Sequence, residues 1–274
     1  MKKIIFSTVL FNTPFNYVER LIESIESLNI QFKNKEINIK VEKFMIWDNS
    51  KISRFSEEQL NTKNFSFETI FTNSKNNLGY GGGHNKNLLR QEINKDIWFV
   101  ALNPDVYFEG KNLIGFFEFI TSKENISSAA PLIYLPDGNI QFSAKKIPTM
   151  ASLLISRFKI LQLIPFFRKY LNKNQNKDLN YENKFIHSPF LSGCFLAFPS
   201  HIYKDVNGFS KKYFLHFEDA DIVRRCSLEG LTLHCPYGSI IHIRGRGSHK
   251  SLTQQFHLAI SYINYSIIWG FRLY

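Results

Sequence analysis

Cysteine is scarce in this chain of 274 residues: there are three, at positions 194, 226 and 235, and no two form a CxxC pair. This odd number argues against a disulfide framework or a structural zinc site, and favours a reducing cytosol. Long apolar runs are also missing, since no stretch has the length and purity of a spanning helix. The run after Lys3 is short and lacks a small-residue cleavage site, which favours a buried strand over a signal peptide.

Acidic residues are in deficit, with 23 Asp and Glu against 34 Lys and Arg and a formal net charge of +11. Such an excess indicates an anionic partner: a nucleic acid, a phosphorylated small molecule or an acidic membrane surface. No helix-turn-helix, zinc-finger or RNP pattern accompanies the charge, so a nucleic-acid-binding module is the weakest of these hypotheses. The length and the hydrophobic content of 44% suffice for one large α/β domain or two small ones.

The stretch from Ile97 to Leu102 is almost entirely apolar, which is typical of a strand buried on both faces of a parallel sheet. It stops at Asn103-Pro104-Asp105, where the proline cannot donate a ladder hydrogen bond. We therefore expect Asp105 at the carboxyl edge of the sheet, where α/β proteins bind ligands. A carboxylate there can hold a divalent cation, and the cation a diphosphate. For the tripeptide alone, a turn with a solvated aspartate is the simpler interpretation.

Two other predicted strands also end in polar residues. Asp48 follows a strand predicted over residues 39–47, where a carboxylate can either contact a ribose or base or close an Asx-turn. A third strand, over residues 67–72, precedes a glycine-rich stretch and a helix predicted to reach Glu92. Glycines at such a joint let the backbone approach a ligand, and helix amides attract phosphate. The spacing is not GxGxxG, so the dinucleotide signal is weak.

The densest acidic cluster, Glu218-Asp219-Ala220-Asp221, opens another predicted helix. The helix dipole favours acids at this end, and Asp221 with Arg225 makes an i,i+4 pair. A well-capped helix therefore explains Asp221, but it does not explain the two carboxylates before it.

A histidine and a basic loop follow near the end of the last predicted strand. His242 stands at that strand end, and Arg244 and Arg246 follow, spaced by glycines. A lone histidine is more often structural than a ligand. Here the combination is suited to completing a metal site and clamping a diphosphate.

Two segments combine apolar and basic or aromatic residues. Residues 145–184 hold nine basic residues against Asp178 and Glu182, interleaved with aliphatic and aromatic side chains. This composition suits a membrane surface with anionic lipid, and a solvated helix pair over the core is the alternative. Residues 252–274 predict either an amphipathic helix with interfacial aromatics or a helix packed on the core. The basic residues are Lys145, Lys146, Arg157, Lys159, Arg168, Lys169, Lys173, Lys177 and Lys184.

In their order and spacing these motifs resemble the inverting glycosyltransferases of family 2, which have a GT-A fold. The resemblance is strongest to bacterial rhamnosyltransferases of O-antigen, lipopolysaccharide and capsule assembly. Each motif alone is weak evidence for the family. Taken together they indicate the family specifically, but they indicate the transferred sugar much less specifically. The motifs are Asn12, Asp48-Asn49-Ser50, Asn77-Leu78-Gly79-Tyr80-Gly81-Gly82-Gly83-His84-Asn85, Leu102-Asn103-Pro104-Asp105, Asp137-Gly138, Ile140-Gln141, Pro148-Thr149, Ser192-Gly193, Phe217-Glu218-Asp219-Ala220-Asp221, Arg225, His242 and Gly247-Ser248.

The resemblance implies an α/β fold of GT-A type, with a Rossmann-like, mixed but mainly parallel sheet flanked by helices. It implies one catalytic domain over residues 1–250, followed by an amphipathic, membrane-associating helix over residues 251–274. Within the domain, residues 1–144 would bind the nucleotide sugar, 145–187 would form a basic variable segment, and 188–250 would form the acceptor and catalytic half.

The same resemblance assigns site residues. Asn103-Pro104-Asp105 stands where the family has its DXD motif, so Asp105 would hold Mg²⁺ or Mn²⁺ with His242 as second ligand. Asp219 aligns with the general base, and Glu218 is the neighbour that could be confused with it. The acceptor side would include Ser192, Gly193 and Asp221. The donor-binding residues would be Asn12, Asp48, Asn77, Gly79, Gly82, Asn85, Asn103, Asp105, Arg244 and Arg246.

The implied activity is inverting transfer of a sugar, foremost L-rhamnose from dTDP-rhamnose, to a hydroxyl of a polyprenyl-diphosphate-linked saccharide. The enzyme would be cytoplasmic and peripheral on the inner face of the membrane, with no nucleic-acid partner. Galactose and glucose donors stay open as alternatives. A sugar-nucleotide-forming nucleotidyltransferase would need a glycine-rich basic loop after the first strand, and Phe11-Asn12-Thr13-Pro14 is not one.

Overall fold

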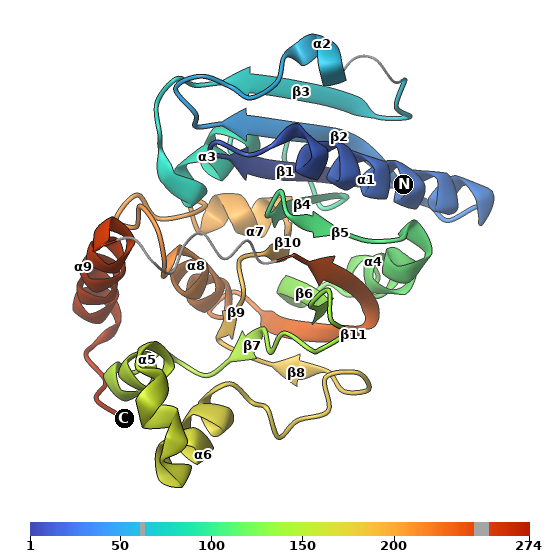
Figure 1. The fold of residues 1–274 in the computed structure, drawn as a ribbon. Coiled ribbons are helices and arrows are strands. Elements are labelled where there is room, and N and C mark those ends of the chain that lie inside the picture. Colours follow the sequence, from blue (N-terminus) through green and yellow to red (C-terminus); the bar gives the residue numbers. More distant parts are fainter. Residues whose placement is uncertain (61–63, 244–251) are drawn as a thin grey trace.

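In the computed structural model, which describes residues 1–60, 64–243 and 252–274, a mixed sheet forms the centre of the molecule (Figure 1). Its order is β3-β2-β1-β4-β10-β6-β11-β5, and β8 pairs with β11. The first four of these strands run parallel, and β10 is antiparallel to β4 and β6. The strands are β1 (Lys2–Leu10), β2 (Ile39–Asp48), β3 (Glu68–Asn73), β4 (Ile97–Leu102), β5 (Val106–Tyr107), β6 (Ile126–Tyr134), β8 (Ile186–His187), β10 (Phe195–Pro199) and β11 (Leu231–His242), with β7 (Ala144–Lys145) and β9 (Phe190–Leu191) in a small second sheet.

Helices cover both faces of the large sheet, and each face has its own apolar cluster. One cluster joins α1 and α4 to the sheet, and the other joins α3, α7 and α8 to it. Every residue of β4 is buried, which confirms the prediction of a strand covered on both faces. The helices are α1 (Phe15–Asn34), α2 (Glu57–Leu60), α3 (Gly79–Leu88), α4 (Ile114–Thr121), α5 (Met150–Arg157), α6 (Pro165–Asn174), α7 (Ser200–Asp205), α8 (Glu218–Cys226) and α9 (Leu252–Trp269), with 3₁₀ turns η1 (Gly110–Leu113) and η2 (Lys159–Leu163).

The glycine-rich helix is shorter than predicted. α3 begins at Gly79 itself and ends at Leu88, four residues before the predicted end at Glu92. The sequence predicts two short strands, over residues 231–234 and 239–243, and in the structure they form one strand, β11, with an irregularity between Cys235 and Ser239. The sequence pattern broke at this irregularity because the register with β6 shifts there.

The C-terminal helix packs against the rest of the molecule through one face only. Tyr262 and Tyr265 of α9 are buried against Phe217, beside the start of α8. The backbone carbonyls of Arg272 and Leu273 accept hydrogen bonds from the first amides of α5, at 2.9 and 3.1 Å. Among the described residues no helix is both long and apolar enough to cross a bilayer.

Candidate active site

The strand topology brings two distant residues, Asp105 and His242, to one edge of the sheet. Asp105 follows the carboxyl end of β4, and β5 then pairs antiparallel with the end of β11, so that Val106 lies opposite His242. The amide of Ile243 also donates to the carbonyl of Asp105 at 2.9 Å. As a result His242 Nε2 lies 3.2 Å from Asp105 Oδ1, which is the convergence expected from the sequence.

A second group fixes the orientation of the His242 ring. His242 is 7% exposed, and its Nδ1 lies 2.8 Å from the amide oxygen of Gln141. An amide oxygen can only accept, so Nδ1 carries the hydrogen. In the neutral ring, Nε2 would then turn a lone pair towards the Asp105 carboxylate and the Asn103 amide, 3.3 Å away. In metal-ligating histidines, one ring nitrogen commonly donates to a neighbouring oxygen, which orients the other nitrogen towards the metal. His242 has this arrangement, with Gln141 as the neighbouring group and Asp105 beside Nε2.

The electrostatics of this pair favour a positive charge between the two side chains. Burial opposes charge on His242, but the Cys194 sulfur and the Asp105 carboxylate outweigh burial and raise the pKa of His242 to about 10. A bound divalent cation would replace that proton and meet the same two groups. The described residues contain no cluster of three or more His, Cys, Asp or Glu suited to a metal. Asp105 and His242 offer two donor groups, so a cation bound between them would take its other ligands from a diphosphate and water.

Asp219 lies in the first turn of α8 and is held by two backbone amides. Its Oδ2 accepts from Gly193 at 3.0 Å, and its Oδ1 accepts from Ala220 at 2.9 Å. A Cβ at Gly193 would lie 3.1 Å from the Asp219 Cβ, so a larger residue there would have to push Asp219 aside by a few tenths of an ångström. The preceding His216 and Phe217 both have positive φ, 70° and 66°. Such a conformation is costly for a bulky side chain and often marks a functional turn.

Glu218 differs from Asp219 in its surroundings. It is 6% exposed, and its Oε2 has no hydrogen-bond partner among the described residues. Burial, and then the charge of Asp219, raise the pKa of Glu218 to about 8. Glu218 therefore keeps its proton at neutral pH, which makes half-buried Asp219 the better candidate for a base.

Tyr80 links the glycine-rich helix to Asp219. Its hydroxyl donates to the carbonyl of Gly193, whose amide in turn holds Asp219. Tyr80 is the aromatic residue inside the glycine-rich motif, but the motif alone did not predict a catalytic or binding role for it. Gln141 was also given no role, because it lies 101 residues from His242 in the sequence and only the fold brings the two side chains together.

The glycine-rich stretch packs against protein where the sequence suggested a ligand. Gly79 has φ +73°, and a Cβ there would lie 2.2 Å from the carbonyl oxygen of Phe214. Asn77 caps this turn by accepting from the Gly79 amide at 2.9 Å, and Gly82 is half-buried within the helix. These glycines serve the close fit of α3 between the sheet and the 209–214 loop, and their role in donor binding stays a prediction.

Two predicted site residues have structural partners instead. The Asn85 oxygen accepts from Tyr203 and from the Phe209 amide at 2.8 and 2.9 Å, and its nitrogen donates to the Phe209 carbonyl. Asp221 is 1% exposed and pairs with Arg225 at 2.7 Å. Trp269 donates to the other Asp221 oxygen at 2.9 Å. These contacts hold a loop and the C-terminal helix, and the donor role of Asn85 and the acceptor role of Asp221 stay predictions.

Of the remaining predicted site residues, some lie at the ends of strands in the sheet and others lie outside the described residues. Asp48 closes an Asx-turn with the Ser50 amide at 2.8 Å, and Ser50 accepts from the Asn12 amide at 2.7 Å, so the ends of β1 and β2 meet. Ser192 is half-buried beside Gly193, and its hydroxyl lies 3.6 Å from the Cys194 sulfur. Arg244 and Arg246 lie outside the described residues.

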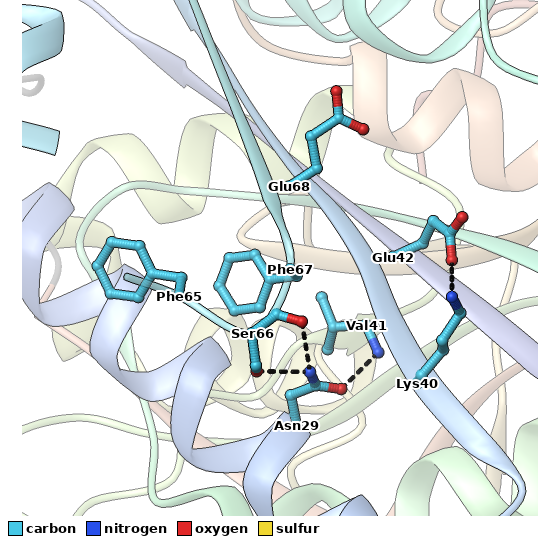
Figure 2. Close-up of a pocket in the computed structure, with 8 residues that line it drawn as sticks. All are labelled: Asn29, Lys40, Val41, Glu42, Phe65, Ser66, Phe67 and Glu68. Atoms are coloured by element: carbon cyan, nitrogen blue, oxygen red, sulfur yellow. Dashed lines mark hydrogen bonds and ion pairs between the residues drawn. The ribbon is translucent and has the colours of Figure 1, made fainter. Parts of the chain in front are cut away.

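A cavity of about 420 Å³ lies at the beginnings of β2 and β3, at the opposite ends of these strands from Asp48 (Figure 2). Its polar groups are already paired: Asn29 donates to Ser66 and accepts from the Val41 amide, and Glu42 contacts Lys40. A second cavity, of about 710 Å³, lies between α1, β5 and the turn after β6. Asp105, His242 and Asp219 line neither cavity.

The mixed α/β fold with its mostly parallel central sheet fits the GT-A fold of glycosyltransferases. The structure of GalNAc-T7 with UDP, GalNAc and Mn²⁺ is similar with a TM-score of 0.62, over 88% of this chain and 43% of that one, at 12% identity. The mannosyltransferase PcManGT from Pyrobaculum calidifontis, in complex with GDP-Man and Mn²⁺, is similar with a TM-score of 0.59, over 97% and 64%, at 9% identity. At such identities the likeness shows the fold.

Relatives found by sequence indicate the kind of glycosyltransferase more closely than the structural neighbours do. The chain is 26% identical over 186 residues to rhamnosyltransferase WbbL of Escherichia coli (strain K12), which covers 65% of this chain and 66% of the relative. It is 26% identical over 183 residues to the N-acetylglucosaminyl-diphospho-decaprenol L-rhamnosyltransferase of Mycobacterium tuberculosis (strain CDC 1551 / Oshkosh), 64% of this chain and 58% of the relative. The chain thus matches less than two thirds of either relative's length.

No protein-family model matches the chain. The sequence relatives and the shared fold confirm the predicted resemblance to family 2 glycosyltransferases, with rhamnosyltransferases among them.

Proposed function

We propose that this protein is a metal-dependent, inverting glycosyltransferase that transfers a sugar from a nucleotide sugar to a hydroxyl group. The observation that carries the proposal is the segment between β9 and β10. Gly193 holds Asp219, and its neighbour Cys194 accepts from the Asn103 amide at 3.0 Å while its sulfur lies beside Gln141. Two consecutive residues therefore connect the base candidate with the Asp105–His242 pair, which supports a single site that contains all three side chains.

In this proposal Asp219 takes the proton of the acceptor hydroxyl as the hydroxyl oxygen attacks the anomeric carbon. The Gly193 and Ala220 amides orient its two oxygens, and Glu218, which keeps its proton, does not compete for the role. When bound by Asp105 and His242, Mg²⁺ or Mn²⁺ supplies charge neutralisation for the departing nucleoside diphosphate. Because the base and the leaving group occupy opposite sides of the sugar, the product would have inverted configuration.

The donor and acceptor follow from the relatives. One relative is named for L-rhamnosyl transfer to an N-acetylglucosaminyl-diphospho-decaprenol, so dTDP-rhamnose and a polyprenyl-diphosphate-linked saccharide are our preferred substrates. The strand ends that carry Asn12 and Asp48 would face the nucleoside, and Ser192 the acceptor. With such an acceptor the enzyme would work at the inner face of the cytoplasmic membrane. The division of residues 1–250 at positions 144 and 187 stays part of this proposal.

A donor screen tests the proposal. Purified protein is mixed with a panel of nucleotide sugars and Mn²⁺ or Mg²⁺, and the released nucleoside diphosphate is measured with and without a chelator. We expect slow, metal-dependent hydrolysis of dTDP-rhamnose, accelerated by a synthetic GlcNAc-diphospho-polyprenol. Hydrolysis of UDP-galactose or UDP-glucose instead would support the alternative donors. Salt-sensitive binding of random oligonucleotides, with every donor left intact, would overturn the enzyme assignment.

A further inference from the structure

Large exposed apolar side chains gather in two segments that are far apart in the chain. Between the end of α5 and the start of α6, the residues Phe158, Ile160, Leu163 and Phe166 are between 54% and 76% exposed. In α9 and the residues after it, Phe256, Ile263, Ile267 and Phe271 are between 57% and 75% exposed. An apolar surface of this kind is uncommon on a protein that has no partner for it.

The two segments form one surface, which we call the outer layer: residues 150–174 together with residues 252–274. Met150 and Ala151 donate to the carbonyls of Arg272 and Leu273, at 2.9 and 3.1 Å. Met150 and Leu153 also pack against the same cluster as Tyr262 and Tyr265. Figure 1 shows α5, α6, α9 and the C-terminus on the same side of the molecule, away from β1 to β3.

The charge of the outer layer has one sign. From residue 145 to residue 177 the sequence has no Asp or Glu, and the same is true of residues 252–274. Lys159, Arg168, Lys169 and Lys173 are exposed on the surface beside the apolar residues. A second copy of this chain would bring like charges together, whereas an anionic lipid surface offers opposite charge and an apolar interior at once.

We propose that the outer layer docks the protein onto a bilayer that contains anionic lipid. The apolar residues of η2 and of the outward face of α9 enter the boundary between headgroups and acyl chains, and the basic side chains contact lipid phosphates. The inference extends the proposed function, because a polyprenyl-linked acceptor would lie in the same bilayer, but the binding step itself needs no sugar chemistry.

The structure also ties this surface to the catalytic helix. Trp269 of α9 donates to Asp221 at 2.9 Å, and the Arg224 guanidinium lies 4.3 Å from the centre of its ring. Both contacts are on α8, within two turns of Asp219. A protein docked through α9 therefore presents α8 in a fixed orientation to the membrane, which suits an acceptor anchored in it.

Vesicle co-sedimentation of the full chain tests the proposal without any substrate. Vesicles of phosphatidylcholine alone are compared with vesicles that also contain phosphatidylglycerol, at low and high salt. We expect binding to the anionic vesicles and its loss at high salt. The triple charge reversal R168E/K169E/K173E should weaken binding at least about 10-fold. Its matched control, K33E/K35E/K51E, reverses three exposed charges outside the outer layer and should bind as the wild type does.

A second pair of variants tests the apolar residues. I160S/L163S should lose vesicle binding, whereas I52S/L228S, at positions 79% and 74% exposed but outside the outer layer, should keep it. Equal binding to neutral and anionic vesicles, or no binding to either, would overturn the proposal. So would a wild-type dimer in solution that the outer-layer variants dissociate. Donor hydrolysis by the same variants is measured separately, so a failed enzyme assignment and a failed docking surface give different results.

Discussion

The sheet edge and the outer layer of this protein are built in opposite ways. At the sheet edge, polar side chains are buried and held by specific partners: Gln141 orients His242, and two amides orient Asp219. In the outer layer, apolar side chains such as Leu163 and Ile267 are three quarters exposed. In the two proposals made above, buried polar groups carry the chemistry and exposed apolar groups make the contact. Substitutions should therefore affect one region and spare the other.

The largest expected effect is on Asp219. Asp219→Asn removes the base and keeps one of its two accepting oxygens, so we expect turnover to fall at least about 100-fold with unchanged vesicle binding and an only slightly lowered melting temperature. The matched variant two residues on, Asp221→Asn, leaves Arg225 without its buried partner and should lower the melting temperature by several degrees. Turnover assays and thermal melts check both. Near-normal turnover of Asp219→Asn would show that Asp219 is not the general base. The contrast between a catalytic sheet edge and a docking outer layer would then no longer hold.

Gln141→Leu probes the group behind His242. It removes the acceptor for Nδ1, so apparent Mn²⁺ affinity should fall about 10- to 100-fold, the usual effect of losing such a partner. The affinity is measured by Mn²⁺ titration of the protein followed by electron paramagnetic resonance, independently of activity. Gln162→Leu makes the same chemical change in the outer layer, where the amide donates to Ile155 at 2.9 Å. An equal loss of affinity in both variants would contradict the assignment.

Tyr80→Phe sharpens the comparison within the sheet edge. It removes the hydroxyl that holds the Gly193 carbonyl, a hydrogen bond worth about 1 kcal/mol, so kcat should fall about 5-fold while KM for the donor is unchanged. This fall in kcat at constant KM is the mark of a positioning residue. Tyr134→Phe, which loses a contact to Glu182, is the control and should leave both constants unchanged. An unchanged kcat in Tyr80→Phe would limit Tyr80 to packing.

The last expected effect is on stability, at Glu218. Burial raises its pKa from 4.5 to about 8, so the folded state binds this proton more tightly than the unfolded state does. The protein should therefore lose stability as the pH rises from 4.5 to about 8. Glu218→Gln removes that loss: the two proteins should melt alike in acid, and the variant should melt at the higher temperature above pH 8. A variant that is less stable across the whole range would contradict a buried, protonated Glu218.

The sequence was sufficient to place side chains at strand ends, because strand burial and strand breakers are local signals. Asp105 after β4 and His242 at the end of β11 were predicted in this way, and the structure joins them. Helix boundaries and the partners of polar residues were harder to predict. The resemblance assigns Asn85 to the donor, and nothing local in the sequence shows that its amide also bonds Phe209, 124 residues away. Tyr80, whose partner Gly193 is 113 residues on, was overlooked for the same reason.

The hydrogen bond from Trp269 to Asp221 matters to anyone who shortens this protein to improve its solubility. Deleting residues 252–274 would remove much exposed apolar surface, but it would also strip α8 of Trp269 and uncover Phe217 just before it. Slow catalysis by such a shortened protein would then reflect a displaced α8, and it could not be taken as a sign that the enzyme needs a membrane.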